Sequence, residues 1–372
     1  MAAMALPLDV CIRGSGIVGR TLALLLARER LRVGLVGAPP PAAGPDVRAY
    51  ALNRASKELL ESLRCWPATD AATPVTRMEI AGDRGGAVTF DAGEFGNDAL
   101  AWIVDVPVLE SLLHDAVGFQ PQIEPLQAPA PARLTVVCEG RASSTRTEFG
   151  VDFEVTPYAQ HAVAARLSCE QPHAGVARQW FVDGDILALL PMGGPQGNSV
   201  ALVWSVSPES ALRLQALDAD TFCRELEAAC GQALGAMTLT SERRSWPLQK
   251  AQARQWSGRA EVGAWVLAGD AAHNVHPLAG QGLNLGLADV AALAKVLRER
   301  DYWRGVDDRQ LLRRYERSRK AGMLALDAGM DGLQLLFARE GEGWSAVRNW
   351  GMKSVQRAGP LKQWLARQAM DF

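Results

Sequence analysis

One glycine-rich run, from Gly269 to Gly286, constrains the fold of this chain more than any other stretch. It follows the apolar segment Ala264 to Ala268, which predicts a buried strand, so an aspartate stands where that strand ends. A Gly-Gln-Gly turn and a helical pattern come next. A carboxylate at a strand end beside a glycine-rich helix start predicts a site for a polar, partly anionic ligand. The alternative is an ordinary strand–loop–helix connection, but such loops rarely hold so many constrained residues.

Composition places the chain among ordinary globular proteins. Its 372 residues, 48% hydrophobic and 22% charged, suffice for one large α/β unit or two intertwined domains. A formal net charge of −2 gives no reason to expect nucleic acid as a partner. The sequence shows no signal peptide and no run of eighteen apolar residues, so we expect a cytoplasmic protein without a membrane span. The six cysteines have no CxxC or metal-ligand spacing, which predicts buried, reduced thiols and no metal site.

The N-terminal segment predicts a compact β-turn-α-β unit. A short apolar strand ends at Ile12 and a second runs from Leu31 to Val36, with a helical pattern between them. The first turn reads Gly14-Ser15-Gly16-Ile17-Val18-Gly19, a GxGxxG pattern. At a strand-to-helix turn, such glycines let a pyrophosphate approach the helix N-terminus, where amide groups and the helix dipole favour negative charge. We therefore expect three residues to contact the ligand, namely Gly14, Gly16 and Gly19.

Two positions depart from this pattern. The second strand of such units usually ends in Asp or Glu, which binds the ribose hydroxyls, but this chain has Gly37 there. Arg13 stands where the first strand normally ends in a small or apolar residue, and it could supply a phosphate or stacking contact. Loss of the ribose carboxylate costs roughly 1.5–3 kcal/mol of binding free energy unless another group compensates. Restoring it by Gly37→Glu or Gly37→Asp is predicted to tighten cofactor binding.

The middle of the chain predicts a second kind of structure. Several strand-like segments in series between Gly150 and Val206 indicate a mostly antiparallel sheet, and Ala264 to Ala268 then returns to the first unit. The predicted class is α/β, with a discontinuous Rossmann-like cofactor domain, an inserted sheet domain for the substrate and a helical C-terminus. The expected boundaries are 8–74, 100–150 and 260–330 for the cofactor domain, 75–99 and 151–259 for the substrate domain, and 331–372 for the helical tail.

Two further clusters join the glycine-rich segments. They are Cys138-Glu139-Gly140-Arg141-Ala142-Ser143-Ser144-Thr145-Arg146 and Arg48-Ala49-Tyr50-Ala51-Leu52-Asn53. With all these motifs in order, the chain resembles the FAD-dependent aromatic hydroxylases, the class A flavoprotein monooxygenases, from Asp9 to about Leu336. Within them, the segments around Arg48 and from His276 to Leu287 are most similar to the ubiquinone-biosynthesis hydroxylases.

This resemblance implies how FAD is held. The three glycines of the first turn would contact the pyrophosphate, Arg48 would lie near the phosphates, and Asp270 would hydrogen-bond the ribityl chain. Pro277 would line the isoalloxazine face. The remaining cofactor contacts are implied for the start of the following helix, namely Gly280, Gln281, Gly282, Leu283 and Asn284. Glu139 stands where the family has an aspartate, a change of one methylene that keeps the charge.

The resemblance also implies a reaction. NAD(P)H, bound transiently, would reduce FAD, O2 would add at flavin C4a, and the hydroperoxide would hydroxylate an electron-rich phenol. The expected substrate is a polyprenylated phenol of ubiquinone biosynthesis, and other quinone-biosynthesis proteins are expected partners. Certain apolar residues of the predicted sheet either line the substrate cleft or belong to the core, with equal weight: Leu187, Leu189, Leu190, Pro191 and Trp204.

Several alternatives remain open. His273 and His276 are candidates for acid/base catalysis, but hydrogen bonding that fixes the loop is the favoured interpretation, so no catalytic base is identified. The tail from Trp344 to Phe372 is basic and rich in tryptophan, which predicts either packing on its own domain or peripheral contact with the inner face of the membrane. Other possible functions are a degenerate flavin-fold scaffold in a quinone-biosynthesis assembly, and another FAD-dependent oxidoreductase such as a halogenase.

Overall fold

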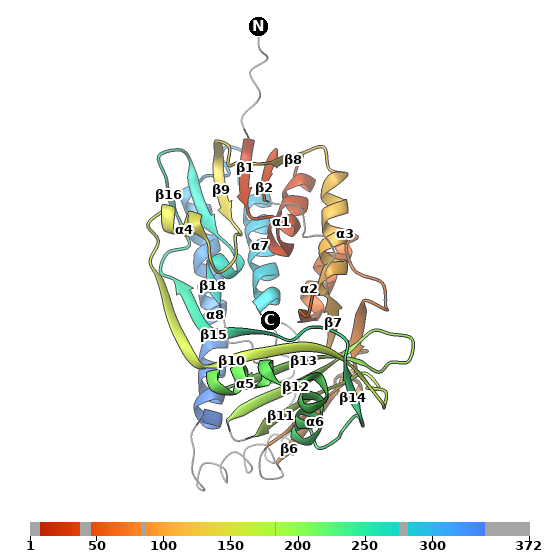
Figure 1. The fold of residues 1–372 in the computed structure, drawn as a ribbon. Coiled ribbons are helices and arrows are strands. Elements are labelled where there is room, and N and C mark those ends of the chain that lie inside the picture. The colour runs from red at the N-terminus through yellow and green to blue at the C-terminus, as the bar shows by residue number, and fades with distance from the viewer. Residues whose placement is uncertain (1–7, 38–45, 83–85, 183, 275–281, 339–372) are drawn as a thin grey trace.

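Three β-sheets organise the part of the chain that the structure describes. This structure, a computed structural model, describes residues 8–37, 46–82, 86–182, 184–274 and 282–338, with side chains as far as Met323. In Figure 1, a sheet flanked by helices forms the upper half of the molecule, and a second, larger sheet crosses the lower half. The described part therefore has the α/β class that the sequence predicts.

The first sheet is parallel except at one edge. Its strand order is β16-β17-β9-β1-β2-β8, and only the pair β16–β17 is antiparallel. Its strands are β1 (Leu8–Arg13), β2 (Val33–Val36), β8 (Ile123–Leu126), β9 (Ala132–Val137), β16 (Ser257–Arg259) and β17 (Ala264–Leu267). The central strands are apolar and buried, and Val10, Ile12 and Val33 belong to the main core that these strands share with the helices. The helices of this half are α1 (Ile17–Arg28), α3 (Val106–Gly118), α7 (Gly282–Arg298) and α8 (Arg309–Ala338).

The second sheet has nine strands and is mostly antiparallel. Its order is β18-β15-β10-β13-β12-β11-β5-β6, with β14 also paired to β10. Its strands are β5 (Arg77–Ala81), β6 (Ala87–Asp91), β10 (Phe153–Cys169), β11 (Val176–Val182), β12 (Asp185–Met192), β13 (Ser199–Val206), β14 (Met237–Leu239), β15 (Arg244–Ala253) and β18 (His273–Asn274). Two helices, α5 (Pro208–Ala216) and α6 (Ala219–Ala229), cover one face and complete a separate hydrophobic cluster with it.

A small third sheet packs against the other face of the nine-stranded sheet. It consists of β3 (Ala49–Leu52), β7 (Ala101–Asp105) and β4 (Ala72–Val75). Ile103 and Val75 of this sheet share a hydrophobic cluster with Ala177, Met192 and Ala201 of the larger one. The remaining helical segments are α2 (Arg54–Ser62), the 3-10 helix η1 (Ala92–Phe95), α4 (Ser144–Glu148) and the 3-10 helix η2 (Gly269–Ala271).

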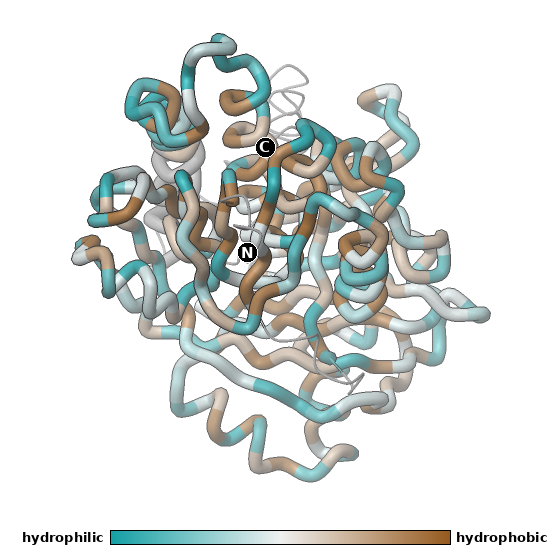
Figure 2. The backbone as a smooth tube through the Cα atoms, turned by 90° about the horizontal axis from the view of Figure 1, so that it is seen from above, coloured by the Kyte–Doolittle hydropathy of each residue, from teal (hydrophilic) through white to brown (hydrophobic). Residues whose placement is uncertain are grey.

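The apolar pattern accounts for most of these elements. Figure 2 shows hydrophobic segments gathered in the interior and hydrophilic ones in the outlying loops. The first strand-like segments after Gly150 form one long strand, β10, which is irregular between Pro157 and His161. All six cysteines are buried and unpaired, as expected. None of the helices in the described ranges combines the length and apolarity that a membrane crossing requires.

Candidate functional site

The sequence motifs meet at one edge of the parallel sheet. Strands β17, β9, β1 and β2 are neighbours in that order, so the residues after their carboxyl ends lie side by side. A Cβ atom on Gly14 would come within 2.5 Å of the Cys138 carbonyl carbon and 2.8 Å of the Glu139 nitrogen. A Cβ atom on Gly286 would come within 2.8 Å of the Val18 side chain and 3.4 Å of the Gly269 Cα. The turn at Gly14 is therefore in direct contact with the loop around Glu139 (the second motif), and the segment from Gly269 to Gly286 (the third motif) is in direct contact with the helix that follows this turn.

The first glycine turn has the shape of an anion cradle. Helix α1 begins after Gly16, and no side chain caps its first amide groups. The space beside Gly16 is open, because a Cβ atom there would meet no atom within 4 Å. A Cβ on Gly19 would instead overlap the Gly14 carbonyl, so this glycine lets the helix lie against the turn. The first amide groups of a helix have no partner within the helix. The exposed turn therefore fits the pyrophosphate of a dinucleotide such as FAD.

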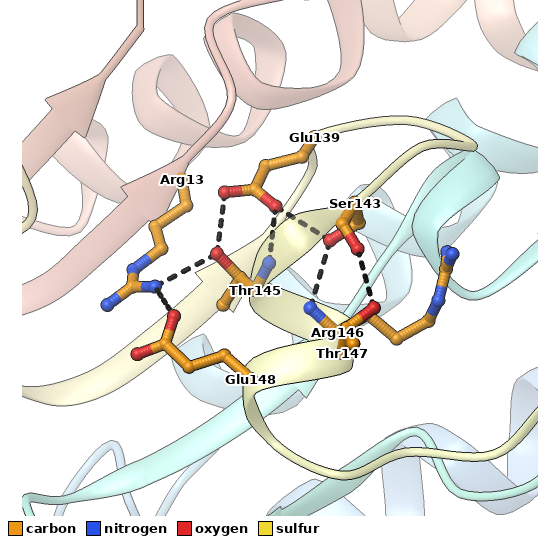
Figure 3. Close-up of polar contacts among 7 residues, drawn as sticks. All are labelled: Arg13, Glu139, Ser143, Thr145, Arg146, Thr147 and Glu148. Carbon is orange, nitrogen blue, oxygen red and sulfur yellow. Dashed lines mark hydrogen bonds and ion pairs between the residues drawn. The ribbon is translucent and has the colours of Figure 1, made fainter.

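The second motif is a hydrogen-bonded loop around Glu139 (Figure 3). The Glu139 carboxylate accepts hydrogen bonds from the Ser143 hydroxyl at 2.7 Å, the Thr145 hydroxyl at 2.6 Å and the Thr145 amide at 3.1 Å. Burial would raise the pKa of Glu139, but these hydrogen bonds outweigh it and hold the pKa below the ordinary value. The longer side chain thus keeps its charge and serves to fix the loop.

Arg13 belongs to the same loop. Its guanidinium donates to the Thr145 hydroxyl at 2.9 Å and to Glu148 at 2.7 Å (Figure 3). It also lies 5.8 Å from the centre of the Phe149 ring. Arg13 therefore makes both kinds of contact within the protein, because Glu148 pairs with its charge and Phe149 is its stacking partner.

Arg146 connects the second motif to the third. Its guanidinium donates to the Ala271 carbonyl at 3.1 Å and to the Arg141 carbonyl at 2.9 Å. The same group lies 3.6 Å from the centre of the Phe153 ring, a cation–π contact. Arg146 is 7% exposed and fastens the loop after β17 to the loop after β9.

A fully buried aspartate holds the start of the third motif. Asp289 of α7 accepts hydrogen bonds from the Gly269 amide at 2.8 Å, from His273 Nε2 at 2.6 Å and from Arg319 Nε at 2.7 Å. Burial opposes its charge, but His273 and Arg319 hold the pKa of Asp289 below the ordinary value. His273 is 1% exposed and also stacks on Trp256, with 4.9 Å between the ring centres. These contacts give His273 the structural role that the sequence favours.

Asp270 has the opposite electrostatic setting. Burial raises the pKa of its carboxyl group, against the opposing effects of nearby His273 and Arg141. The pKa of the nearby Tyr50 is raised, mainly by burial and also by the charge of Asp270. For Asp270, burial therefore outweighs the favourable contacts, which include a hydrogen bond with Asn274, whereas for Asp289 the contacts outweigh burial.

Arg48 lies in a cluster of its own with Asp46, Glu110 and Tyr50. It donates to Asp46 through Nε at 2.9 Å and is 3.6 Å from Glu110, and its hydrogen bond with Tyr50 links it toward Asp270. Hydrogen bonding to Asp46 is the main reason that the pKa of Arg48 is raised. The arginine is 44% exposed, so a phosphate could share it.

Two predicted cofactor residues face inward instead. Leu283 is buried in the main core. The Asn284 side chain donates to the Ala51 carbonyl at 2.8 Å and accepts from the Asn53 amide and the Ser56 hydroxyl. Their side chains therefore position β3 and α2, and only the backbone at the start of α7 remains suited to a ligand. Four predicted site residues lie outside the described residues, namely His276, Pro277, Gly280 and Gln281.

The apolar residues suggested for the substrate cleft or the core divide between the two faces of the nine-stranded sheet. Leu189 and Trp204 are buried in the cluster under α5 and α6, on the face turned away from the third sheet. Alternation along β12 places Pro191 on that face as well. Leu187 belongs to the same cluster, so these residues are core, one of the two alternatives that the sequence left open, whereas Leu190 lies on the opposite face.

The opposite face of the sheet is turned toward the cofactor motifs. Leu190 and Met192 on this face pack against β3 and its neighbours, and β18, which follows Asp270, pairs with β15. One row of cross-strand neighbours runs across five strands of this face: Phe181, Ile186, Ser205, Ala162 and Trp246. The row has aromatic residues at both ends and small residues in between. In the described residues, no cluster of three His, Cys, Asp or Glu side chains is placed to hold a metal ion.

Comparisons with known proteins agree with this geometry. The sequence model of a family described as FAD binding domain matches residues 107–326. The 3-demethoxyubiquinol 3-hydroxylase of Escherichia coli (strain K12) is 31% identical over 98% of each chain. The ubiquinone hydroxylase UbiL of Rhodospirillum rubrum is also 31% identical, over 97% of this chain and 89% of its own. The solved structure of p-nitrophenol 4-monooxygenase PnpA from Pseudomonas putida covers 99% of both chains with a TM-score of 0.77, and at 16% identity it shows the fold alone.

Proposed function

The chain belongs to the family of FAD-dependent monooxygenases that includes the ubiquinone-biosynthesis hydroxylases, and from that premise we propose that it hydroxylates the aromatic ring of a polyprenylated phenol. NAD(P)H is the proposed transient reductant and O2 the oxygen donor. The observation that carries the substrate class is the row of neighbours from Phe181 to Trp246, on the sheet face turned toward the cofactor motifs. The proposed division of labour follows the predicted boundaries, with the parallel-sheet parts holding the cofactor and the nine-stranded sheet receiving the substrate.

The residues present fit FAD. We propose that Gly14, Gly16 and Gly19 hold the pyrophosphate at the start of α1, because this turn is open and its amides have no capping side chain. Arg48 would contribute charge beside the phosphates, and Asp270 would accept a hydrogen bond from the ribityl chain. When bound, the flavin supplies the redox chemistry with O2, while the protein orients the substrate and excludes water.

The proposed substrate surface suits a flat ring with an apolar tail. Five adjacent strands span about 19 Å at the usual strand spacing. Phe181, Ile186 and Trp246 of the row are half-buried, and the two small residues between them, Ala162 and Ser205, are buried. A prenylated substrate partitions into lipid, so we propose that the enzyme takes it up at the membrane surface, in contact with other enzymes of the same pathway.

Two matched tryptophan variants test the substrate surface. Trp246 and Trp180 are both half-buried in the nine-stranded sheet, but Trp180 packs toward α5 and α6 on the other face. Trp246→Ala is expected to raise KM for a prenylated phenol about tenfold, the effect of losing roughly 1.4 kcal/mol of apolar contact. Trp180→Ala should leave KM unchanged. The measurement is substrate-dependent NAD(P)H oxidation, together with mass detection of a product one oxygen heavier.

The controls separate the parts of this proposal. Equal KM effects of the two variants would contradict the assigned face. A wild-type protein that binds FAD and oxidises NAD(P)H without adding oxygen to any prenylated phenol would contradict the substrate class. A deletion strain with an unchanged quinone profile would do the same.

A further inference from the structure

Position 37 has no side chain, and the structure shows why. Gly37 follows β2 directly, at the place where related nucleotide-binding folds carry the carboxylate that binds the adenosine ribose. A Cβ atom there would lie 2.5 Å from the Ser15 Cβ and 2.9 Å from the Ser15 amide nitrogen, and closer still to the Ser15 hydroxyl. Real Cβ atoms do not approach other heavy atoms this closely, and a backbone nitrogen cannot swing aside as a side chain can. Ser15 and any side chain at position 37 therefore exclude one another.

The neighbouring strands fix this exclusion. Strands β1 and β2 are paired in parallel with Arg13 opposite Val36, and the Gly14 amide donates to the Val36 carbonyl at 2.9 Å. The turn that carries Ser15 is thus fastened to the end of β2. Neither residue can move away without breaking the edge of the sheet at which the cofactor motifs meet.

Ser15 brings a polar group to the same place. Its hydroxyl oxygen is the atom nearest to the place that the Cβ of a residue at position 37 would take, and the flanking Gly16 and Gly37 are exposed. A hydroxyl can donate one hydrogen bond and accept others, so a bond within the protein does not prevent it from binding a ribose hydroxyl, directly or through a water molecule.

We propose that Ser15 is the side chain that recognises the adenosine ribose in this protein, in place of a carboxylate at position 37. The inference rests on FAD as the cofactor. It reverses the expectation from the sequence, because Gly37→Glu should weaken FAD binding rather than strengthen it. The ribose contact in this protein is neutral, so it should not depend on pH.

The first experiment compares two flavins. The full-length chain, freed of flavin under mild conditions, is titrated with FAD and with FMN, which lacks the adenosine half. Ser15→Ala is expected to lower FAD affinity about 3- to 10-fold, as befits one neutral hydrogen bond, and to leave FMN affinity within twofold of the wild type. An equal loss for both flavins would overturn the proposal, because it would place the effect of Ser15 on the turn or the phosphates. Failure of the wild type to bind FAD would instead contradict the proposed function.

The second experiment moves the contact back to position 37. Gly37→Glu alone should lower FAD affinity at least tenfold, and the double variant Ser15→Gly with Gly37→Glu should recover part of this loss, because the side-chain overlap is removed while the Ser15 backbone nitrogen still lies 2.9 Å from the Cβ position. Tighter binding by Gly37→Glu alone, or a double variant no better than that single variant, would overturn the mutual exclusion. If Gly37→Glu does not fold, the flavin comparison of Ser15→Ala still decides the matter.

Discussion

The two ends of the candidate cofactor site are made of the same parts but are secured by different forces. Each end has a strand and the start of a helix, α1 at the adenosine end and α7 at the Asp270 end. At the Asp270 end, buried charge does the work, because Asp289 joins the Gly269 amide, His273 and Arg319. At the adenosine end, the packing depends on glycines, because a Cβ atom on Gly14, Gly19 or Gly37 would overlap neighbouring atoms. The first end should therefore respond to pH and to loss of charge, and the second to added atoms.

The largest effect is expected from Asp289→Ala. This change leaves His273 and Arg319 without their shared carboxylate in a buried site, which typically costs about 3–5 kcal/mol of unfolding free energy. Urea unfolding of the flavin-free protein measures it. Asp301→Ala, which removes a half-exposed partner of Arg304, is the control and should change little.

The pH dependence of this variant checks the same idea. Because the folded pKa of Asp289 is lowered, its stabilising effect is present above the unfolded pKa of about 3.9 and is lost as the pH falls toward the folded value. The stability difference between wild type and Asp289→Ala should therefore shrink in acid below about pH 4. A difference that stays constant there would mean that packing, rather than charge, holds this end.

An intermediate effect is expected at the adenosine end from a matched pair of glycines. Gly19→Ala should cost about 1–3 kcal/mol of stability, because its Cβ would overlap the Gly14 carbonyl and push α1 away from the turn. Gly16→Ala has open space and an ordinary backbone conformation, with φ −73°, so stability should not fall. The same Cβ would occupy the approach to the helix start, so FAD affinity should drop at least tenfold. Unaltered FAD affinity in Gly16→Ala would argue against the cradle.

The two ends also differ in how much their sequence reveals. The strand ends, the glycine turns and the α/β class follow from apolar runs and spacing, and so does the gathering of Gly14, Glu139 and Asp270 at one edge. The loss of a carboxylate at Gly37 is equally visible. Its cause is not, because Ser15 lies 22 positions earlier and only the strand register brings the two together. Periodicity likewise shows that Leu189 is buried but not which face of the sheet it lies on.

Asp289 could have been found from the sequence. It is a lone acid within the otherwise apolar pattern of the helix that follows the glycine-rich run, and a buried acid requires a partner. His273 was available as that partner, on the same motif. The interpretation of His273 as a loop-fixing residue would then have had a physical reason. The third member, Arg319, could not be assigned, because only tertiary packing brings α8 against α7.

The smallest effect, and one of opposite sign, is expected from Asp270→Asn. Burial raises the folded pKa of Asp270, so its ionised form destabilises the flavin-free protein at neutral pH. The amide should therefore increase stability by about 0.5–1 kcal/mol at pH 7, the scale of a single polar contact. The gain should vanish as the pH falls through the folded pKa toward about 3.9, because Asp270 is then neutral in the wild type too.

The same variant should bind FAD about tenfold more weakly, since a charged hydrogen-bond acceptor for the ribityl chain is lost. Thermal unfolding with and without FAD measures both effects. A variant that is less stable without flavin would show that Asp270, like Asp289, serves the fold, and the contrast between a charge kept for structure and a charge kept for the cofactor would fail.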